Sequence, residues 1–298
     1  MITFNSLNIE SKSLYDSYYK RFDNEVSELT FTNLFMWRKK YNFKYAVIQD
    51  FLWILNETPS GKWYFSPPIG DYSKGVESSI LELKKYLKGQ NRPFIIKKAG
   101  EKVLRKLSTS NVAFQYMADR DSFDYIYNVE NLKELRGKSY HKKKNHVNKF
   151  IKTYDDWQYE PLTQENMADV LKCLESWCRI HKCQQDLDLN HEHRAIIDAL
   201  DHFELLDYEG GLIRINGNVE SFTLAEQLDG NTLVIHIEKA STDFSGLYNM
   251  INREYLKNTS VQSTFVNREQ DMGLEGLRKS KLSYHPVKLM EKYTIELL

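Results

Sequence analysis

Polar side chains that could carry acid–base chemistry gather on three segments in the second half of the chain. The run TLVIHIEKA alternates, which predicts that Val234, His236 and Glu238 share one face of a strand. The other two segments end a second strand and form a short helix, and they carry Asn267, Arg268, Glu269 and Asp271, then Arg278, Lys281 and His285. Strand ends and helix starts often carry polar residues, but three such clusters on neighbouring elements predict a cleft.

Familiar nucleophile and metal motifs are missing from the sequence. It has no G-x-S-x-G, P-loop, G-x-G-x-x-G or H-E-x-x-H pattern. Zinc sites usually pair ligands two to four residues apart, whereas Cys173, Cys178 and Cys183 are five apart. We therefore expect buried cysteines on a packing helix and no metal, even with His181, His191 and His193 nearby.

A basic run, LRGKSYHKKKNHVNKF, lies near the middle of the chain. If the segment 138–154 is helical, one narrow apolar stripe comprises Tyr140, Val147, Ile151 and Tyr154. The opposite side then carries Lys138, His141, Lys142, Asn145, Lys149 and Lys152. Two interpretations stay open: a connecting helix with a solvated basic face, or an electrostatic seat for a phosphate-rich partner such as tRNA.

The helices and strands that must position these residues follow a similar order in both halves of the chain. Each half offers helices, antiparallel strands, a helix and further strands, and in the second half NGN and DGN are strong hairpin signals. This order predicts an α+β fold with mixed sheets and two similar domains, although no repeat is visible at the level of sequence.

Composition describes an ordinary soluble protein. The 298 residues include 41 basic and 41 acidic side chains, so attraction to an anionic partner must be local. The start lacks the features of a signal peptide, and no apolar run reaches the length of a membrane span. Together with an odd number of cysteines, this predicts a cytoplasmic protein.

Four segments resemble a known family: SELTFTNLFMWR, VIHIEKA, GLYNMINREY and VNREQDMGLEGLRKSKLSYHPV. They look like bacterial proteins grouped with the C-terminal domain of phosphatidylglycerol lysyltransferase, and the last segment is the most specific. That family is similar to the Fem-type aminoacyltransferases, which contain two domains of the Gcn5-related N-acetyltransferase (GNAT) type. The resemblance implies GNAT-like domains at residues 1–130 and 151–298, the second carrying the site, with a basic connecting helix at residues 131–150.

The resemblance implies acyl or aminoacyl transfer, in which an acceptor amine or hydroxyl attacks an activated ester directly. Such a reaction needs two substrates held together, a base and stabilisation of the oxyanion. We expect Glu238 or His236 to act as the base. Lys281 and Arg278 would neutralise charge. Arg268 and Asn267 would position the acceptor, and the expected substrate-binding set also includes Glu269 and Tyr284.

Two acyl donors remain open for such an enzyme, and so does the alternative that the protein has no catalytic activity. The phosphate-cradling loop of acetyl-CoA-dependent relatives carries closely spaced glycines, but KASTDFSGLY retains only Gly246. We therefore expect aminoacyl-tRNA rather than acyl-CoA as donor, no required cofactor, and an amine or hydroxyl acceptor. Lys138, Lys142, Lys149 and Lys152 would bind the nucleic acid. The alternative is a GNAT-fold module that has lost its activity and binds RNA or another anionic partner.

Overall fold

The computed structural model describes residues 2–58 and 60–298. The chain forms two compact units. Unit 1 comprises Met1–Asp124 together with Met290–Leu298, and unit 2 comprises Tyr125–Leu289.

Unit 1 is built on a seven-stranded sheet in the order β1-β2-β3-β4-β5-β14-β6. Its strands are β1 (Asn5–Ser6), β2 (Lys44–Ile48), β3 (Phe51–Glu57), β4 (Trp63–Phe65), β5 (Ile95–Gly100), β6 (Phe114–Ala118) and β14 (Lys292–Leu297). Its helices are α1 (Lys12–Tyr19), α2 (Phe31–Tyr41), α3 (Glu77–Gly89) and α4 (Glu101–Ser108).

Unit 2 is built on a second seven-stranded sheet in the order β13-β7-β12-β11-β10-β9-β8. Its strands are β7 (Asp124–Asn128), β8 (Trp157–Pro161), β9 (Tyr208–Ile215), β10 (Asn218–Gln227), β11 (Thr232–Ala240), β12 (Phe265–Asn267) and β13 (Lys288–Met290). Its helices are α5 (Val129–Glu134), α6 (His141–Thr153), α7 (Met167–His181), α8 (Leu187–Asp201), α9 (Leu247–Asn258) and α10 (Glu275–Leu282).

The two sheets share one topology. In each, four neighbouring strands are antiparallel, and the fourth pairs in parallel with the next strand. These parallel pairs are β4 with β5 in unit 1 and β11 with β12 in unit 2. A helix connects the parallel strands in both units, α3 in the first and α9 in the second. The predicted α+β class, with mixed and mainly antiparallel sheets in two similar domains, is confirmed.

The last strand of the chain belongs to the first sheet. β14 lies between β5 and β6 and is antiparallel to both. Its Lys292 is fully buried and binds Glu28 and Asp124 at 2.6 Å each, within unit 1. The predicted second domain included this strand, and it began at residue 151 rather than at Tyr125. Alternation of residue types identifies a strand but does not name its partner, so sequence alone could not place β14.

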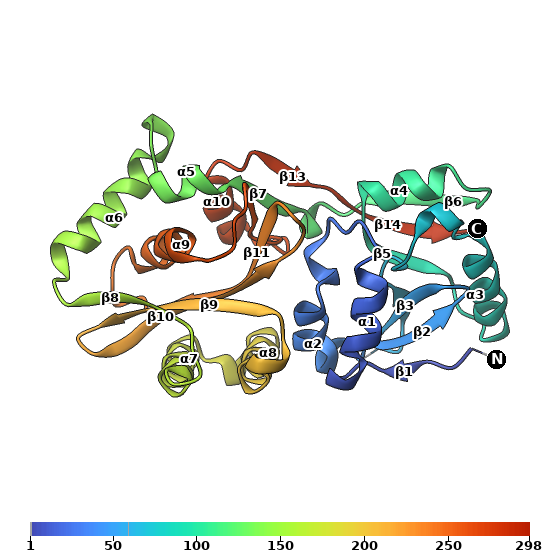
Figure 1. Ribbon diagram of the computed structural model, residues 1–298, viewed down its shortest axis with the longest axis horizontal. Coiled ribbons are helices and arrows are strands. Elements are labelled where there is room, and N and C mark those ends of the chain that lie inside the picture. Colours follow the sequence, from blue (N-terminus) through green and yellow to red (C-terminus); the bar gives the residue numbers. More distant parts are fainter. Residues whose placement is uncertain (1, 59) are drawn as a thin grey trace. The chain divides into compact units, whose positions relative to one another are not determined.

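Local sequence accounts for several boundaries in unit 2. The hairpin between β9 and β10 turns at Asn216 and Gly217, whose φ angles of 48° and 80° suit the predicted two-residue turn. Helix α8 begins after Asp186, whose side chain accepts hydrogen bonds from two backbone N–H groups. Figure 1 shows α9 on one face of this sheet and α7 and α8 on the other.

Gly246 begins α9 and has a packing role. Its φ is 93°, and a Cβ there would lie 2.7 Å from the carbonyl oxygen of His146 in α6. Only glycine both tolerates this φ and lets α9 approach the backbone of α6 so closely.

Candidate active site

A β-bulge interrupts β11 at His236. Leu224 of β10 pairs with Ile237, and the next residue, Ala225, pairs with Ile235. His236 is therefore the extra residue, and the strict alternation predicted for this strand does not hold across it. The bulge moves His236 and Glu238 to different partners.

His236 lies between two carboxylates. Its Nδ1 is 2.7 Å from Glu269 and its Nε2 is 2.7 Å from Glu226, and the ring is almost fully buried. Burial alone would lower the pKa of His236, but the hydrogen bonds and charges of Glu226 and Glu269 raise it to about 10. Both ring nitrogens of this imidazolium donate hydrogen bonds, so His236 has no lone pair with which to accept a proton. The expectation that it acts as a base does not fit this geometry.

Glu238 lies on the α9 side of the sheet. Its Oε1 accepts a hydrogen bond from Arg268 Nη2 at 2.8 Å, and its Oε2 accepts one from Asn252 of α9 at 3.0 Å. The next residue, Lys239, points to the opposite face and binds Glu192 of α8 at 2.6 Å. Glu238 and Arg268, predicted from separate segments, therefore form one ion pair.

Arg268 is enclosed by aromatic rings. Its guanidinium carbon is 4.8 Å from the ring centre of Tyr284 and 5.8 Å from that of Tyr127. Although burial opposes its charge, Glu238 raises the pKa of Arg268 further. Its buried Nη1 has no hydrogen-bond partner within the part of the chain that the structure describes, so one donor group of the guanidinium is unused.

A second cation, which was not predicted from the sequence, lies over the ring of Tyr284. The Lys143 ammonium of α6 is 3.8 Å from the centre of the Tyr284 ring. The Tyr284 hydroxyl accepts a hydrogen bond from Asn249. Burial, and then the charge of Arg268, lower the pKa of Lys143 to about 8. Lys143 therefore belongs to the same cluster as Glu238, Arg268 and Tyr284.

Lys281 and Asn267 hold the backbone beside this cluster. The Lys281 ammonium donates to the carbonyl oxygens of Arg268 and Glu269. The buried Asn267 side chain accepts a hydrogen bond from the Glu269 N–H at 2.7 Å, where the backbone turns with φ of 56°. These contacts position the neighbouring side chains.

Arg278 fastens the next turn. It donates two hydrogen bonds to the fully buried Asp271, at 2.8 and 2.9 Å, and Asp271 also accepts from the Tyr125 hydroxyl. Burial would raise the pKa of Asp271, but these hydrogen bonds hold it well below its usual range. Arg278 therefore ties α10 to the loop after β12, and the charge neutralisation expected of it stays a prediction.

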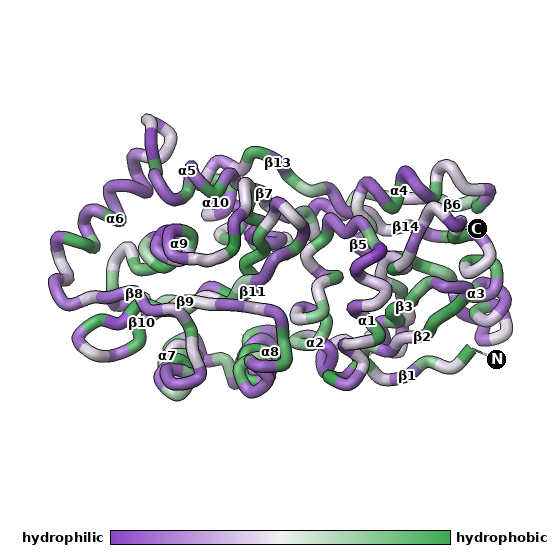
Figure 2. The backbone as a smooth tube through the Cα atoms, viewed as in Figure 1, coloured by the Kyte–Doolittle hydropathy of each residue, from purple (hydrophilic) through white to green (hydrophobic). Residues whose placement is uncertain are grey.

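The basic run forms α6, preceded by a single 3-10 turn. Figure 2 shows this helix mainly in the hydrophilic colour. The residues expected to bind nucleic acid are all exposed: Lys138, Lys142, Lys149 and Lys152. Within the described residues none of these four side chains forms an ion pair, so their charges are available.

The buried side of α6 differs from the predicted stripe. Tyr140 and Val147 are buried as expected, but Ile151 is 42% exposed and Phe150 is fully buried. Lys143 shares the inner side because it lies three residues after Tyr140 and four before Val147. A lysine at this inward position interrupts the apolar pattern of the helix. That interruption was the only feature of the sequence that indicated a special role for Lys143.

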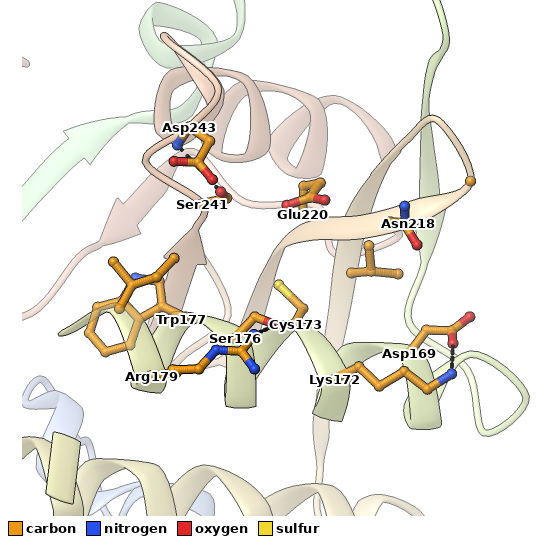
Figure 3. A pocket seen from close by; sticks show the side chains of 13 residues that line it. Asp169, Lys172, Cys173, Ser176, Trp177, Arg179, Asn218, Glu220, Ser241 and Asp243 are labelled. Atoms are coloured by element: carbon orange, nitrogen blue, oxygen red, sulfur yellow. Dashed lines mark hydrogen bonds and ion pairs between the residues drawn. The ribbon is translucent and has the colours of Figure 1, made fainter. Parts of the chain in front are cut away.

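A groove of about 350 Å³ lies on the other face of the same sheet. Figure 3 shows Trp177, Arg179 and Lys172 along α7, with Glu220 and Asp243 across from them. Burial and the nearby charge of Asp243 raise the pKa of Glu220. The lining residues include none of the predicted site residues, so the groove is separate from the Glu238 cluster.

The cysteines are arranged differently from the prediction. Cys178 and Cys183 form a disulfide, which was not expected because five residues of continuous helix would turn the two side chains apart. The helix ends at His181 and Lys182 adopts a φ of 54°, which brings Cys183 back. Cys173 is free, and its burial raises the thiol pKa to about 12. No cluster of potential metal ligands occurs among the described residues.

The topology of both sheets defines the class of the protein: a tandem GNAT-fold protein. The family model described as phosphatidylglycerol lysyltransferase, C-terminal, matches residues 19–296, and the chain belongs to that family. The family's description names an enzyme that transfers an aminoacyl group, phosphatidylglycerol lysyltransferase.

Solved structures of other proteins share this fold. A conserved protein of unknown function from Bacteroides thetaiotaomicron VPI-5482 has a TM-score of 0.90 and 32% identity, with complete coverage of both chains. L-PGS from Bacillus licheniformis shares the fold at a TM-score of 0.66 and 10% identity, covering 98% of this chain and 92% of that one. FemX shares it at a TM-score of 0.61 and 11% identity, covering 99% and 97%.

An uncharacterised protein of Mycoplasmoides gallisepticum is 27% identical over 185 residues, which are 59% of this chain. The match spans only 57% of that relative's length. Within the described residues, no helix has both the length and the apolar character needed to cross a bilayer.

Proposed function

We propose that this protein transfers an aminoacyl group from aminoacyl-tRNA to an amine or hydroxyl acceptor, with its chemistry at Glu238 and Arg268. The observation that carries the proposal is their ion pair, in which Glu238 is also held by Asn252. A carboxylate fixed by one hydrogen bond on each oxygen keeps further lone pairs with which to accept a proton.

The proposed reaction needs no enzyme nucleophile. The acceptor nitrogen or oxygen forms a bond to the ester carbonyl carbon while its proton passes to Glu238, directly or through water. The ester C–O bond then breaks, and the leaving ribose oxygen takes up the proton that Glu238 received, directly or through water. Arg268 stabilises the negative charge on the carbonyl oxygen, with Nη1 as the donor that its protein contacts leave unused.

The remaining predicted residues support this pair. Lys281 positions Arg268 by binding its carbonyl oxygen, and Asn267 fixes the adjoining turn. Glu269 holds the His236 imidazolium, and Tyr284 provides the ring against which Arg268 lies. We assign proton transfer to Glu238 alone.

Two features support tRNA as the donor in preference to acyl-CoA. The exposed lysines of α6 and its preceding turn offer charge to a phosphate backbone. The single glycine of the β11–α9 connection is explained by packing against His146, which leaves the glycine-rich phosphate loop without a counterpart. The family's name makes lysine the first aminoacyl group to test, and charged tRNA would place the reaction in the cytoplasm.

Binding of tRNA at several salt concentrations tests the donor. Replacing Lys138, Lys142, Lys149 and Lys152 with glutamine should weaken binding and reduce the slope of log affinity against log salt by up to about 3. The matched control replaces four exposed lysines of unit 1, which are Lys62, Lys85, Lys88 and Lys106. Equal salt slopes in the two variants would show that the basic side of α6 is only solvated.

A further inference from the structure

Lys143 lacks the compensation that a partly buried cation usually has. Its ammonium lies on the Tyr284 ring, and no carboxylate pairs with it in the described part of the chain. The charge of Arg268 repels it, and Arg268 already pairs with the carboxylate of Glu238. The cluster therefore holds two cations and one anion, and a further anion would balance it.

The location of Lys143 does not stabilise α6. It lies in the first turn, where the helix dipole disfavours positive charge, and no side chain caps that end of the helix. An exposed position was available within the same turn, because Lys142 and Lys144 on either side both face solvent. The inward placement of this one lysine is thus better explained by a ligand than by helix stability.

We propose that Lys143 and Arg268, brought together on the ring of Tyr284, bind a phosphate group of the activated donor. Arg268 supplies the positive charge of its guanidinium, and Lys143 supplies a compact ammonium charge that is partly exposed to arriving ligand. The identity of the ligand as a donor rests on the proposed function. Both possible donors carry this chemistry, a phosphodiester at the 3′ end of tRNA or a pyrophosphate in acyl-CoA.

The environment of Lys143 makes its protonation a specific readout. Arg268 stays charged and pairs with Glu238, while burial raises the hydroxyl pKa values of Tyr127 and Tyr284. Lys143 is thus the group of this cluster whose charge changes near pH 8. Affinity for phosphate should fall as the pH rises through that value, because the ammonium form is the one that binds an anion.

The experiment measures binding of two probes by calorimetry between pH 6.5 and 9.5. One is a cytidine-cytidine-adenosine trinucleotide with an amide-linked lysine at its 3′ end, and the other is desulfo-coenzyme A. Lys143→Gln should weaken binding of the true donor probe about 10- to 100-fold at pH 7 and abolish the fall in affinity near pH 8. Lys143→Arg should retain binding within about threefold and extend it to pH 9.5, because the guanidinium stays charged.

Lys144→Gln, which removes the same charge from an exposed neighbour, is the control and should change affinity less than about threefold. Thermal unfolding of each variant establishes that it is folded. If Lys143→Gln binds both probes as Lys144→Gln does, or if the wild-type protein binds neither probe, the phosphate site is refuted. If only desulfo-coenzyme A binds and depends on Lys143, the site stands and the tRNA donor of the proposed function fails.

Discussion

At His236 the protein holds a buried positive charge between two carboxylates. The contacts to Glu226 and Glu269 raise the pKa from its ordinary value of 6.5 to about 10, so folding favours the imidazolium. Its contribution to stability is complete below pH 6.5 and disappears as the pH rises through 10. His236 was predicted as one of two candidate bases. Its contacts instead link Glu226 of β10 to Glu269 in the loop after β12.

Replacing His236 with glutamine leaves two buried carboxylates without their shared cation. We expect a loss of about 3–5 kcal/mol in the free energy of unfolding at pH 6.5. The difference from the wild-type protein should shrink as the pH approaches 10, because the wild-type histidine then loses its proton. Urea unfolding across this range measures the difference, and a gap that stays constant with pH would show that His236 is neutral in the fold.

At the scale of the element, the start of α9 depends on a glycine for two separate reasons. Gly246→Ala would strain a φ of 93° and place a methyl group 2.7 Å from the carbonyl oxygen of His146. We expect it to cost at least about 2 kcal/mol in the free energy of unfolding.

Gly217→Ala separates the two causes. Gly217 has a similar φ of 80°, but a methyl group added there would meet no atom within 4 Å, so only the backbone strain applies. Its cost should be about 1 kcal/mol. Equal losses in the two variants, measured by urea unfolding, would mean that α9 does not depend on its close approach to α6.

Helices, strands and turns were predictable from the sequence where a short-range pattern determines them. The candidate site was predictable only in part. Turn residues located the β9–β10 hairpin, and the polar residues of β11 and of the end of β12 predicted a shared cleft, but not the ion pair of Glu238 with Arg268. The bulge at His236 has no residue-level signature, because it depends on the register between β10 and β11. The role of Lys143 was hidden for a similar reason, since its partners come from distant segments.

At the scale of the whole molecule, the two units share one sheet topology but differ in what occupies corresponding positions. The strand beside the parallel pair is β14 in unit 1 and β7 in unit 2. In unit 2 the parallel pair presents Glu238 and ends at Arg268. In unit 1 the buried polar centre is instead a set of ion pairs linking Glu28, Lys98 and Lys292. We therefore expect transfer activity to depend on unit 2 residues.

The most direct test follows label from tRNA charged with radioactive amino acids into lipid, peptide and cell-wall precursor fractions. The account predicts transfer by the wild-type protein into one of these fractions, and a rate about 10²- to 10⁴-fold lower for Glu238→Gln with tRNA affinity unchanged. Glu275→Gln, at an exposed carboxylate of α10, is the matched control and should transfer normally. If charged tRNA binds but no fraction gains label, the protein is a binding module, and if Glu238→Gln transfers as fast as the wild type, Glu238 is not the base.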